Sequence, residues 1–271
     1  MKETGRWLFL IGVVGGLFAV LLLDAEDPAP GFFPGGPSEI GSEDPDRAVK
    51  AIRKWSEPNA WEGTEDAGSS PYFWDFEKVG RPVFLRIIKN DNRTGLLEVW
   101  LENEESREFE FFKAYRIAYF SGEPGPKTKE GDGQAPEGFY TISRARLNPE
   151  SGYHLAMDVG YPNDYDRQLG RTGGLIMIHG KSVSIGCFAM TDAAIEQLYT
   201  LVDAALKDGQ NFVRVHSFPF PMTGEMMSRH RGSVHEPFWE NLKEGWDWFQ
   251  ENRCPPEVTV KDGRYVFGIE R

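Results

Sequence analysis

The sequence predicts a fold of the α+β class that is mainly β. Three apolar runs between residues 81 and 120 are separated by turn-forming residues, which is typical of consecutive antiparallel strands. Between Leu175 and Leu206, a short apolar run, a tight loop and an amphipathic helix follow one another. Near the C-terminus the Asp262-Gly263 pair separates two more strand-like runs and suits a type I′ hairpin turn.

Residues 1–25 are predicted to be a signal peptide or an N-terminal membrane anchor. Lys2 and Arg6 precede 17 continuous apolar or glycine residues from Trp7 to Leu23, and acidic residues follow at once. This order of charges directs the rest of the chain out of the cytoplasm. The run is long for a signal-peptide core and short for a spanning helix, so both interpretations stay open. We therefore expect a periplasmic or otherwise extracytoplasmic protein, secreted or tethered to the inner membrane by this segment.

Residues 26–75 are predicted to be a flexible linker, because they are rich in Pro, Gly and acidic residues and have no sustained period. Residues 76–271 are predicted to form one folded domain. It starts with the strand-like runs RPVFLRIIKN, GLLEVWLEN and REFEFFKAYRIAYF. In the second run apolar residues occupy alternate positions, which predicts an antiparallel sheet with one solvent-facing side.

Two long loops rich in Gly and Pro follow, one before a strand at Phe139 and one before the central stretch. Ordered loops of this length are usually functional. The central helix is expected to start at Thr191 or Asp192 and to end before Gly209. After it, the sequence predicts the strand NFVRVHSF and a helical region with apolar residues at helical spacing, namely Trp239, Leu242, Trp246 and Phe249.

The charge and the spacing of residues argue against nucleic acid as a partner and against a metal ion as a cofactor. The net charge is −12 and the basic residues are scattered, whereas a nucleic-acid binder needs clustered Lys and Arg. The five histidines are also scattered, and no closed spacing such as CxxC is present. Two cysteines in a chain of this size do not make a disulfide framework, and Cys254, before two prolines, is expected to be half-buried and inert.

The loop of the central stretch holds His179 and, eight residues later, Cys187. Acyl transfer by cysteine needs a thiolate, a base that accepts and returns the proton, and donors for the oxyanion. Cys187 offers the nucleophile and His179 the base, while backbone N–H groups around Gly186, with Ser184, offer the donors. Just upstream of a helix N-terminus, the thiol is expected to gain thiolate character.

No Asp or Asn is placed behind His179, so a backbone carbonyl is expected to fix its tautomer. A cysteine near a helix start is, however, more often a small buried hydrophobic residue than a nucleophile. From the residues alone, both interpretations of Cys187 stay open.

Several motifs in fixed order resemble a known family. They are GDGQAPEGFYTI, YHLAMDVGYPNDYDRQLGRTG, IMIHG, SIGCFAMTD, FVRVHSFPF and PPEVTVKDGRYVF. Together they resemble the L,D-transpeptidase catalytic domain of the YkuD type, in particular its YafK-like branch, from Pro82 to Phe267. The resemblance implies a β-sandwich catalytic domain with a helix after the cysteine and further C-terminal helices. It also implies action on peptidoglycan stem peptides without a metal or organic cofactor.

Within this resemblance, Cys187 matches the family nucleophile and His179 the base of the HG motif. Gly186 and Ser184 match the glycine and the hydroxyl residue of the family signature. Their backbone and side-chain donors are the expected oxyanion site.

Two positions depart from the main branch of the family. Ile185 stands where most members have a second histidine, and Ala189 where they have an arginine or asparagine. Both departures remove groups that help to hold the acyl donor. The residues expected to replace them are Arg167 and Arg171, for a diaminopimelate carboxylate, and Tyr153 and His154, along the cleft. An arginine that pins its own loop through backbone carbonyls is the alternative.

The resemblance predicts a cell-envelope cysteine acyltransferase that attacks diaminopimelate-containing peptides and forms a Cys thioester. Its partners would be peptidoglycan stem peptides, with the membrane contacted only through the N-terminal segment. The YafK-like branch includes members that detach an envelope lipoprotein from peptidoglycan by hydrolysis, so an amidase is the close alternative. A non-catalytic peptidoglycan-binding module that has kept the fold is the second alternative.

Overall fold

The computed structural model describes residues 78–90 and 95–268. These residues belong to one compact unit of the chain. The expected signal peptide or anchor (1–25), the expected linker (26–75) and the boundary between linker and domain all lie outside the described residues. Within the described part, no helix is both long and apolar enough to cross a membrane.

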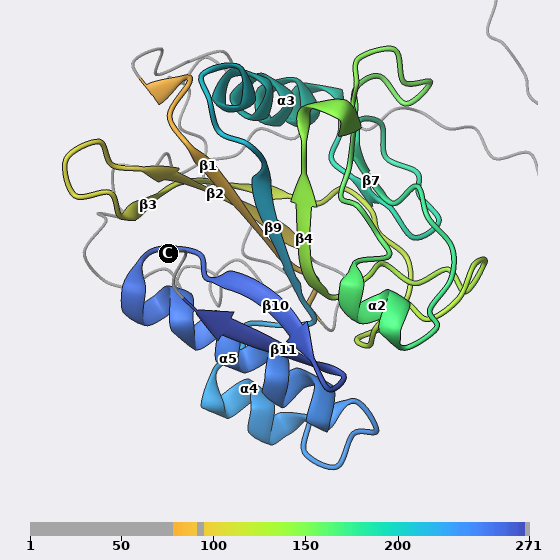
Figure 1. Ribbon diagram of the computed structural model, residues 1–271. Coiled ribbons are helices and arrows are strands. Elements are labelled where there is room, and N and C mark those ends of the chain that lie inside the picture. The colour runs from red at the N-terminus through yellow and green to blue at the C-terminus, as the bar shows by residue number, and fades with distance from the viewer. Residues whose placement is uncertain (1–77, 91–94, 269–271) are drawn as a thin grey trace, which may run out of the picture. The chain divides into compact units, whose positions relative to one another are not determined.

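A five-stranded mixed sheet forms the centre of the domain (Figure 1). The first three strands are antiparallel neighbours, as the sequence predicted, and the last strand of the sheet lies between the first and the fourth. In spatial order the strands are β3 (Phe109–Arg116), β2 (Leu96–Glu102), β1 (Val83–Ile88), β9 (Val213–Phe218) and β4 (Gly138–Ile142).

A smaller four-stranded sheet lies beside the central sheet and shares its main core. Its strands are only two or three residues long. They are β5 (Leu147–Asn148), which follows a short 3₁₀ helix at Arg144–Arg146, β6 (Ala156–Asp158), β7 (Met177–His179) and β8 (Phe188–Ala189). The pair β7 and β8 is parallel, whereas the other pairs are antiparallel. The strand β8 is not predictable from the sequence, because two residues carry no periodicity.

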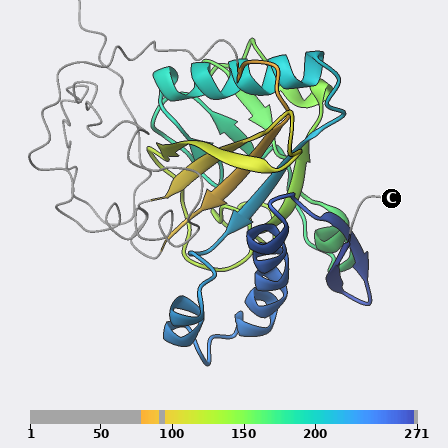
Figure 2. The ribbon, with the colours of Figure 1, turned by 90° about the vertical axis from the view of Figure 1, so that its left-hand side faces the viewer.

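The helix α3 (Asp192–Lys207) covers one face of the central sheet. It begins at the N-cap Thr191, whose side chain accepts a hydrogen bond from the Ala194 N–H, and it ends just before Gly209, as predicted. Figure 2 shows α3 above the sheet and α5 below it. A second short helix, α2 (Asp164–Gln168), interrupts the long loop that leads to β7.

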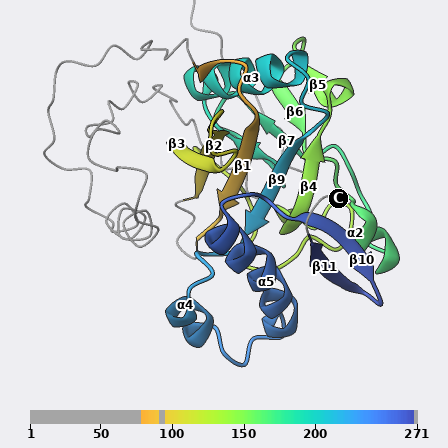
Figure 3. The same cartoon turned by 60° about the vertical axis from the view of Figure 1, so that its left-hand side comes forward.

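The C-terminal elements cover the opposite face of the sheet (Figure 3). They are α4 (Gly224–Arg229), α5 (Glu236–Asn252) and the hairpin of β10 (Glu257–Lys261) and β11 (Arg264–Gly268). All four apolar residues predicted for the helical region are buried on α5. Both turn residues of the hairpin have positive φ, as a type I′ turn requires.

The prediction of one solvent-facing side for β2 is wrong. Leu97 and its alternate neighbours face the main core, but Glu98 and Trp100, on the other side, are buried as well. Glu98 accepts a 2.6 Å hydrogen bond from Arg86, whose guanidinium lies 4.2 Å from the ring of Trp246 on α5. The covering helix therefore turns an apparent polar face into a second interior layer. The fold is α+β with mixed sheets, as the sequence predicted.

His216 lies in this second layer, between the rings of Phe84 and Phe139 at 4.6 and 4.7 Å. Its Nδ1 has no hydrogen-bond partner among the described residues. Burial lowers the pKa of this imidazole well below its usual value, and the positive charges of Arg214 and Arg86 act in the same direction. His216 is thus a neutral core residue.

A buried ion pair joins β1 to the loop before β4. Lys89 and Glu137 are both fully buried, and their charged groups are 2.8 Å apart. Glu137 also accepts hydrogen bonds from the Gly125 N–H and the Trp239 indole, at 2.7 and 2.9 Å. Lys89 donates to three backbone carbonyls of the same loop. Each of the two buried charges therefore has its counter-charge and further hydrogen-bond partners.

Removing one charge from this pair should destabilise the domain strongly. We expect Glu137→Gln to lower the free energy of unfolding by about 3–5 kcal/mol, because the Lys89 ammonium is left buried without a counter-charge. The matched control is Asp203→Asn, which breaks the solvent-exposed pair of Asp203 with Lys207 and should cost less than about 1 kcal/mol. Urea unfolding followed by circular dichroism measures both. If both variants lost the same free energy of unfolding, the buried pair would not be more important for stability than the surface pair.

Candidate active site

The short strands β7 and β8 bring His179 and Cys187 to the same face of the small sheet. The strands pair with Ile178 opposite Phe188 and with His179 opposite Ala189. Ile178 and Phe188 point into the main core, so the alternate positions, which include His179 and Cys187, point to the other face. Cys187 directly precedes β8 and stands diagonally across from His179 in the register of the two strands.

The sulfur of Cys187 makes two backbone contacts. The Met177 N–H donates to Sγ at 3.3 Å, and the thiol faces the Leu175 carbonyl oxygen at 3.6 Å. Cys187 lies upstream of α3, as expected, but β8 stands between Cys187 and the helix, which begins at Asp192. The N–H group that faces the sulfur comes from the neighbouring strand instead.

The ring of His179 is held in one tautomer. It is only 4% exposed, and its Nδ1 lies 2.6 Å from the Gly180 carbonyl oxygen. Since a carbonyl only accepts, Nδ1 carries the proton and Nε2 is left as the acceptor. This confirms the expectation that a backbone carbonyl fixes the tautomer. The ring of Tyr153 packs against His179, with centroids 4.9 Å apart.

Burial moves both titratable groups toward their neutral forms. It raises the pKa of the Cys187 thiol, although the Met177 N–H and the Ser184 hydroxyl act in the opposite direction. It also lowers the pKa of the His179 imidazole, against the effect of the Gly180 hydrogen bond. The resting pair is a neutral thiol and a neutral imidazole rather than the thiolate expected from the sequence. Such a pair suits activation of the thiol by a general base.

The segment before Cys187 is fixed by hydroxyl groups. Gly186 has φ +91°, and its N–H donates to the Ser121 hydroxyl oxygen at 2.7 Å. Ser184 donates to the Cys187 carbonyl oxygen at 2.8 Å. The N–H of Gly186 and the hydroxyl of Ser184, both expected to serve the oxyanion, thus have intramolecular partners in this structure. Sequence reasoning missed Ser121, because no local pattern links it to a residue so distant in the chain.

Both arginines expected to bind a substrate carboxylate are held within their own loop. Arg167 pairs with Asp164 at 2.5 Å and donates to the Pro162 carbonyl. Arg171 pairs with the buried Asp166 at 2.7 Å. Among the described residues, no contact joins either guanidinium to His179 or Cys187. Arg167 thus has the contact with a backbone carbonyl that the alternative described, whereas Arg171 is held by the Asp166 carboxylate.

Tyr153 and His154, expected together along the cleft, point to different partners. Tyr153 is half exposed and covers the His179 ring. His154 turns away, with Nε2 2.8 Å from a carboxylate oxygen of Glu196 on α3. Of the two, only Tyr153 contacts the candidate catalytic pair in the described part of the chain.

The two positions that depart from the main branch of the family, Ile185 and Ala189, carry apolar side chains. Ile185 is 83% exposed and Leu175, whose carbonyl faces the sulfur, is 74% exposed. Ala189 is fully buried, and its N–H donates to the Tyr119 carbonyl at 2.9 Å in an isolated bridge. The surroundings of Ala189 therefore leave no room for a long cationic side chain.

Within the described residues, no group of three or more His, Cys, Asp or Glu side chains could hold a metal ion.

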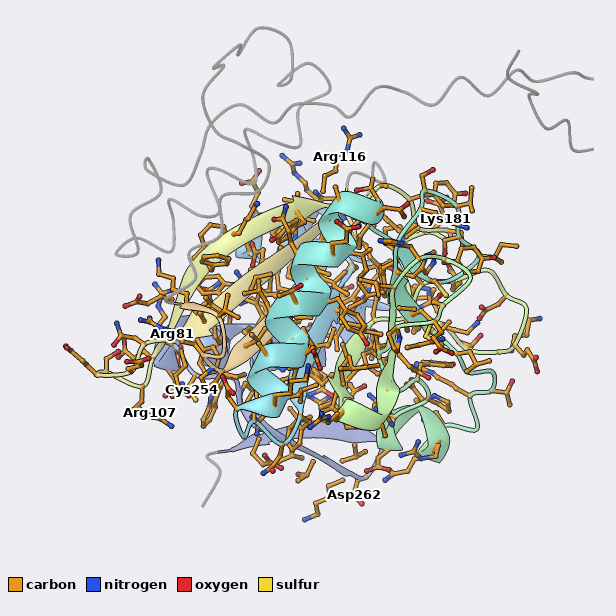
Figure 4. The ribbon with its side chains drawn as sticks, turned by 90° about the horizontal axis from the view of Figure 1, so that it is seen from above. Arg81, Arg107, Arg116, Lys181, Cys254 and Asp262 are labelled. Atoms are coloured by element: carbon orange, nitrogen blue, oxygen red, sulfur yellow. The ribbon has the colours of Figure 1, made fainter. Side chains whose placement is uncertain are left out.

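The second cysteine, Cys254, is exposed rather than half-buried as expected. In the view onto α3, Cys254 and Lys181, which follows His179 by two residues, lie on opposite sides of the helix (Figure 4).

The family model for the L,D-transpeptidase catalytic domain (YkuD) matches residues 87–224, just over half of the chain. The chain belongs to the L,D-transpeptidase family. It is also 44% identical over 188 residues to the protein described as "Putative L,D-transpeptidase YafK" in Escherichia coli strain K12, covering 69% of this chain and 74% of that protein. The same values hold for its counterpart in Escherichia coli O157:H7.

Among solved structures, the chain is similar to a mutant form of the helical cell shape determining protein Pgp2 from Campylobacter jejuni. The identity is 21% and the TM-score 0.40, with 67% of this chain and 63% of that chain covered. For Bd1075 from Bdellovibrio bacteriovorus, the identity is 18% and the TM-score 0.34, with 64% and 63% covered. The chain thus spans less than two thirds of the length of either structure.

The neutral resting pair predicts how the reactivity of Cys187 depends on pH. We expect its rate of alkylation by iodoacetamide to rise continuously from pH 6 to beyond 9, the ordinary thiol value, because the thiolate is the reactive form and burial raises the pKa. Peptide mass mapping in a Cys254→Ser background isolates the signal of Cys187. A rate already constant between pH 6 and 8 would instead indicate a thiolate–imidazolium pair.

The conformation of Gly186 predicts a cost for any side chain at this position. A Cβ there would lie 3.3 Å from the Gln134 carbonyl oxygen, and positive φ is unfavourable for other residues. We expect Gly186→Ala to lower the free energy of unfolding by about 1–2 kcal/mol. The control is Gly224→Ala, at a glycine with open space around it, which should have little effect. Urea unfolding of the two variants provides the comparison.

Proposed function

We propose that the protein is a cell-envelope cysteine acyltransferase that acts on diaminopimelate-containing peptidoglycan peptides. The observation that carries the proposal is the shared face of His179 and Cys187 on β7 and β8, with Nδ1 of the histidine satisfied by the Gly180 carbonyl. This leaves Nε2 as the acceptor for the thiol proton. Membership of the L,D-transpeptidase family supports the same chemistry.

In the acylation step, Nε2 of His179 takes the thiol proton while Sγ of Cys187 attacks a peptide carbonyl at the L-centre of diaminopimelate. The proton then passes to the leaving amine, the C–N bond breaks, and a thioester forms. In the second step an amine or a water molecule attacks the thioester. His179 removes the proton of the attacking group, the C–S bond breaks as the new C–N or C–O bond forms, and the proton passes to the sulfur, which regenerates the free thiol.

Backbone N–H groups beside the sulfur are the proposed donors to the tetrahedral intermediate. The N–H of Met177 already points at Sγ. The second proposed donor is the N–H of Cys187 itself, the residue that carries the sulfur. At rest the N–H of Gly186 is bonded to Ser121, so in this proposal it shapes the loop. It does not bind the oxyanion.

The acceptor decides between two outcomes. An amine acceptor gives a cross-link or an attached protein, whereas water gives an amidase that could release an envelope lipoprotein from diaminopimelate. Ile185 and Ala189 replace groups that help to hold the acyl donor in the main branch of the family. For this reason hydrolysis is kept as the alternative outcome. For either outcome we propose an extracytoplasmic location, with export directed by residues 1–25.

The test is incubation of the full-length protein with diaminopimelate-containing muropeptides, followed by mass analysis. New dimers indicate transfer, and loss of an attached lysine or peptide indicates hydrolysis. Cys187→Ala should abolish either product, and His179→Gln should lower kcat by about 10²–10⁴-fold, the usual contribution of a general base.

Two controls make the test specific. Cys254→Ser and His230→Gln change the same residue types outside the site, and both should keep the turnover of the unmodified protein. If muropeptides bind but no product forms, and the alkylation rate of Cys187 does not depend on His179, the protein is a binding module and the enzymatic proposal fails.

A further inference from the structure

Ser121 connects the catalytic segment to a loop far away in the sequence. Its hydroxyl oxygen accepts a 2.7 Å hydrogen bond from the Gly186 N–H and donates at 2.7 Å to the Gly133 carbonyl. We propose that Ser121 is a positioning residue, which sets the backbone of Gly186 and thereby the place of the Cys187 sulfur. The proposal rests on the acyl-transfer function proposed above.

The geometry around Cys187 explains why this contact matters. The sulfur is directed by the Met177 N–H, and the carbonyl of Cys187 is held by Ser184. The peptide group between residues 185 and 186 precedes a glycine at φ +91°, and glycine can rotate easily. The bond from Ser121 fixes the plane of this peptide group. Small displacements of reacting atoms are costly in rate, so a fixed plane favours catalysis.

The loop that carries Ser121 is itself anchored in the protein interior. The Ser121 carbonyl accepts from the Ala135 N–H at 3.1 Å, and the Ala135 carbonyl accepts from the Lys89 ammonium at 2.9 Å. Lys89 is neutralised by Glu137 at 2.8 Å. Ser121 is therefore connected to a buried ion pair through two hydrogen bonds, which makes its position rigid.

The same chain of contacts reaches the C-terminal helix. Glu137 accepts a 2.9 Å hydrogen bond from the indole of Trp239 on α5. The family model ends at residue 224, before this helix. The contacts run without a break from Trp239 through Glu137, Lys89 and Ala135 to Ser121. A helix outside the matched region is thus connected through these contacts to the loop that carries Ser121.

The test compares Ser121→Ala with Ser217→Ala in the full-length protein. Ser217 is a matched control, because its buried hydroxyl also donates at 2.7 Å to a carbonyl near this loop, that of Pro136, and makes no described contact with Gly186. Three quantities are measured: kcat and KM with muropeptides, the alkylation rate of Cys187 at pH 7, and the hydrogen exchange of the Gly186 amide by NMR.

For Ser121→Ala we expect kcat and the alkylation rate to fall about tenfold with KM unchanged, since the sulfur is misplaced but the cleft is intact. The Gly186 amide should exchange at least about tenfold faster, because its acceptor is gone. Ser217→Ala should change none of these. If Ser121 had only a structural role, both variants would change alike. The Gly186 amide would then exchange no faster in Ser121→Ala than in Ser217→Ala.

Each other result overturns the inference. Unchanged exchange in Ser121→Ala means that the bond does not hold Gly186, and faster exchange with unchanged rates means that the bond does not position the sulfur. If the unmodified protein turns over no muropeptide, the proposed function fails separately. Alkylation and exchange then decide the role of Ser121 by the same criteria.

Discussion

The pairing of β7 with β8 is the constraint on which the candidate site depends. In a strand, successive side chains alternate between faces, so a slip of one residue would send His179 and Cys187 into the core and expel Ile178 and Phe188. Strands this short gain little from their own hydrogen bonds. The burial of Ile178 and Phe188 in the core shared by both sheets therefore fixes the register. Packing on one face of the small sheet determines the chemistry on the other.

The fold was predictable wherever the sequence repeats with a clear period. The first three strands, α3, the apolar side of α5 and the final hairpin all follow from local spacing and turn residues. The solvent-facing side of β2 was not predictable, because Glu98 looks like a surface residue until Arg86 and α5 are seen to cover it. Sequence spacing describes one element at a time, and the second interior layer arises from elements more than 100 positions apart.

The candidate site divides in the same way. His179, Cys187 and the carbonyl that holds the imidazole are local, since Gly180 directly follows the histidine. The surroundings of the other residues depend on distant contacts or on burial, which the local sequence does not show. Ser121 has no local signature, and Arg171 looked available because its partner Asp166 could have faced solvent instead of the interior. The neutral state of the Cys187 thiol was also not predictable from the sequence, because burial has the largest effect on its pKa.

The buried bridge between Ala189 and Tyr119 has a consequence for how this branch of the family can evolve. A single codon change to arginine at position 189 would force a long side chain into a filled interior, where overpacking is destabilising. The backbone bridge between Ala189 and Tyr119 would have to move first. A long side chain at position 189 therefore requires several neighbouring residues to change with it.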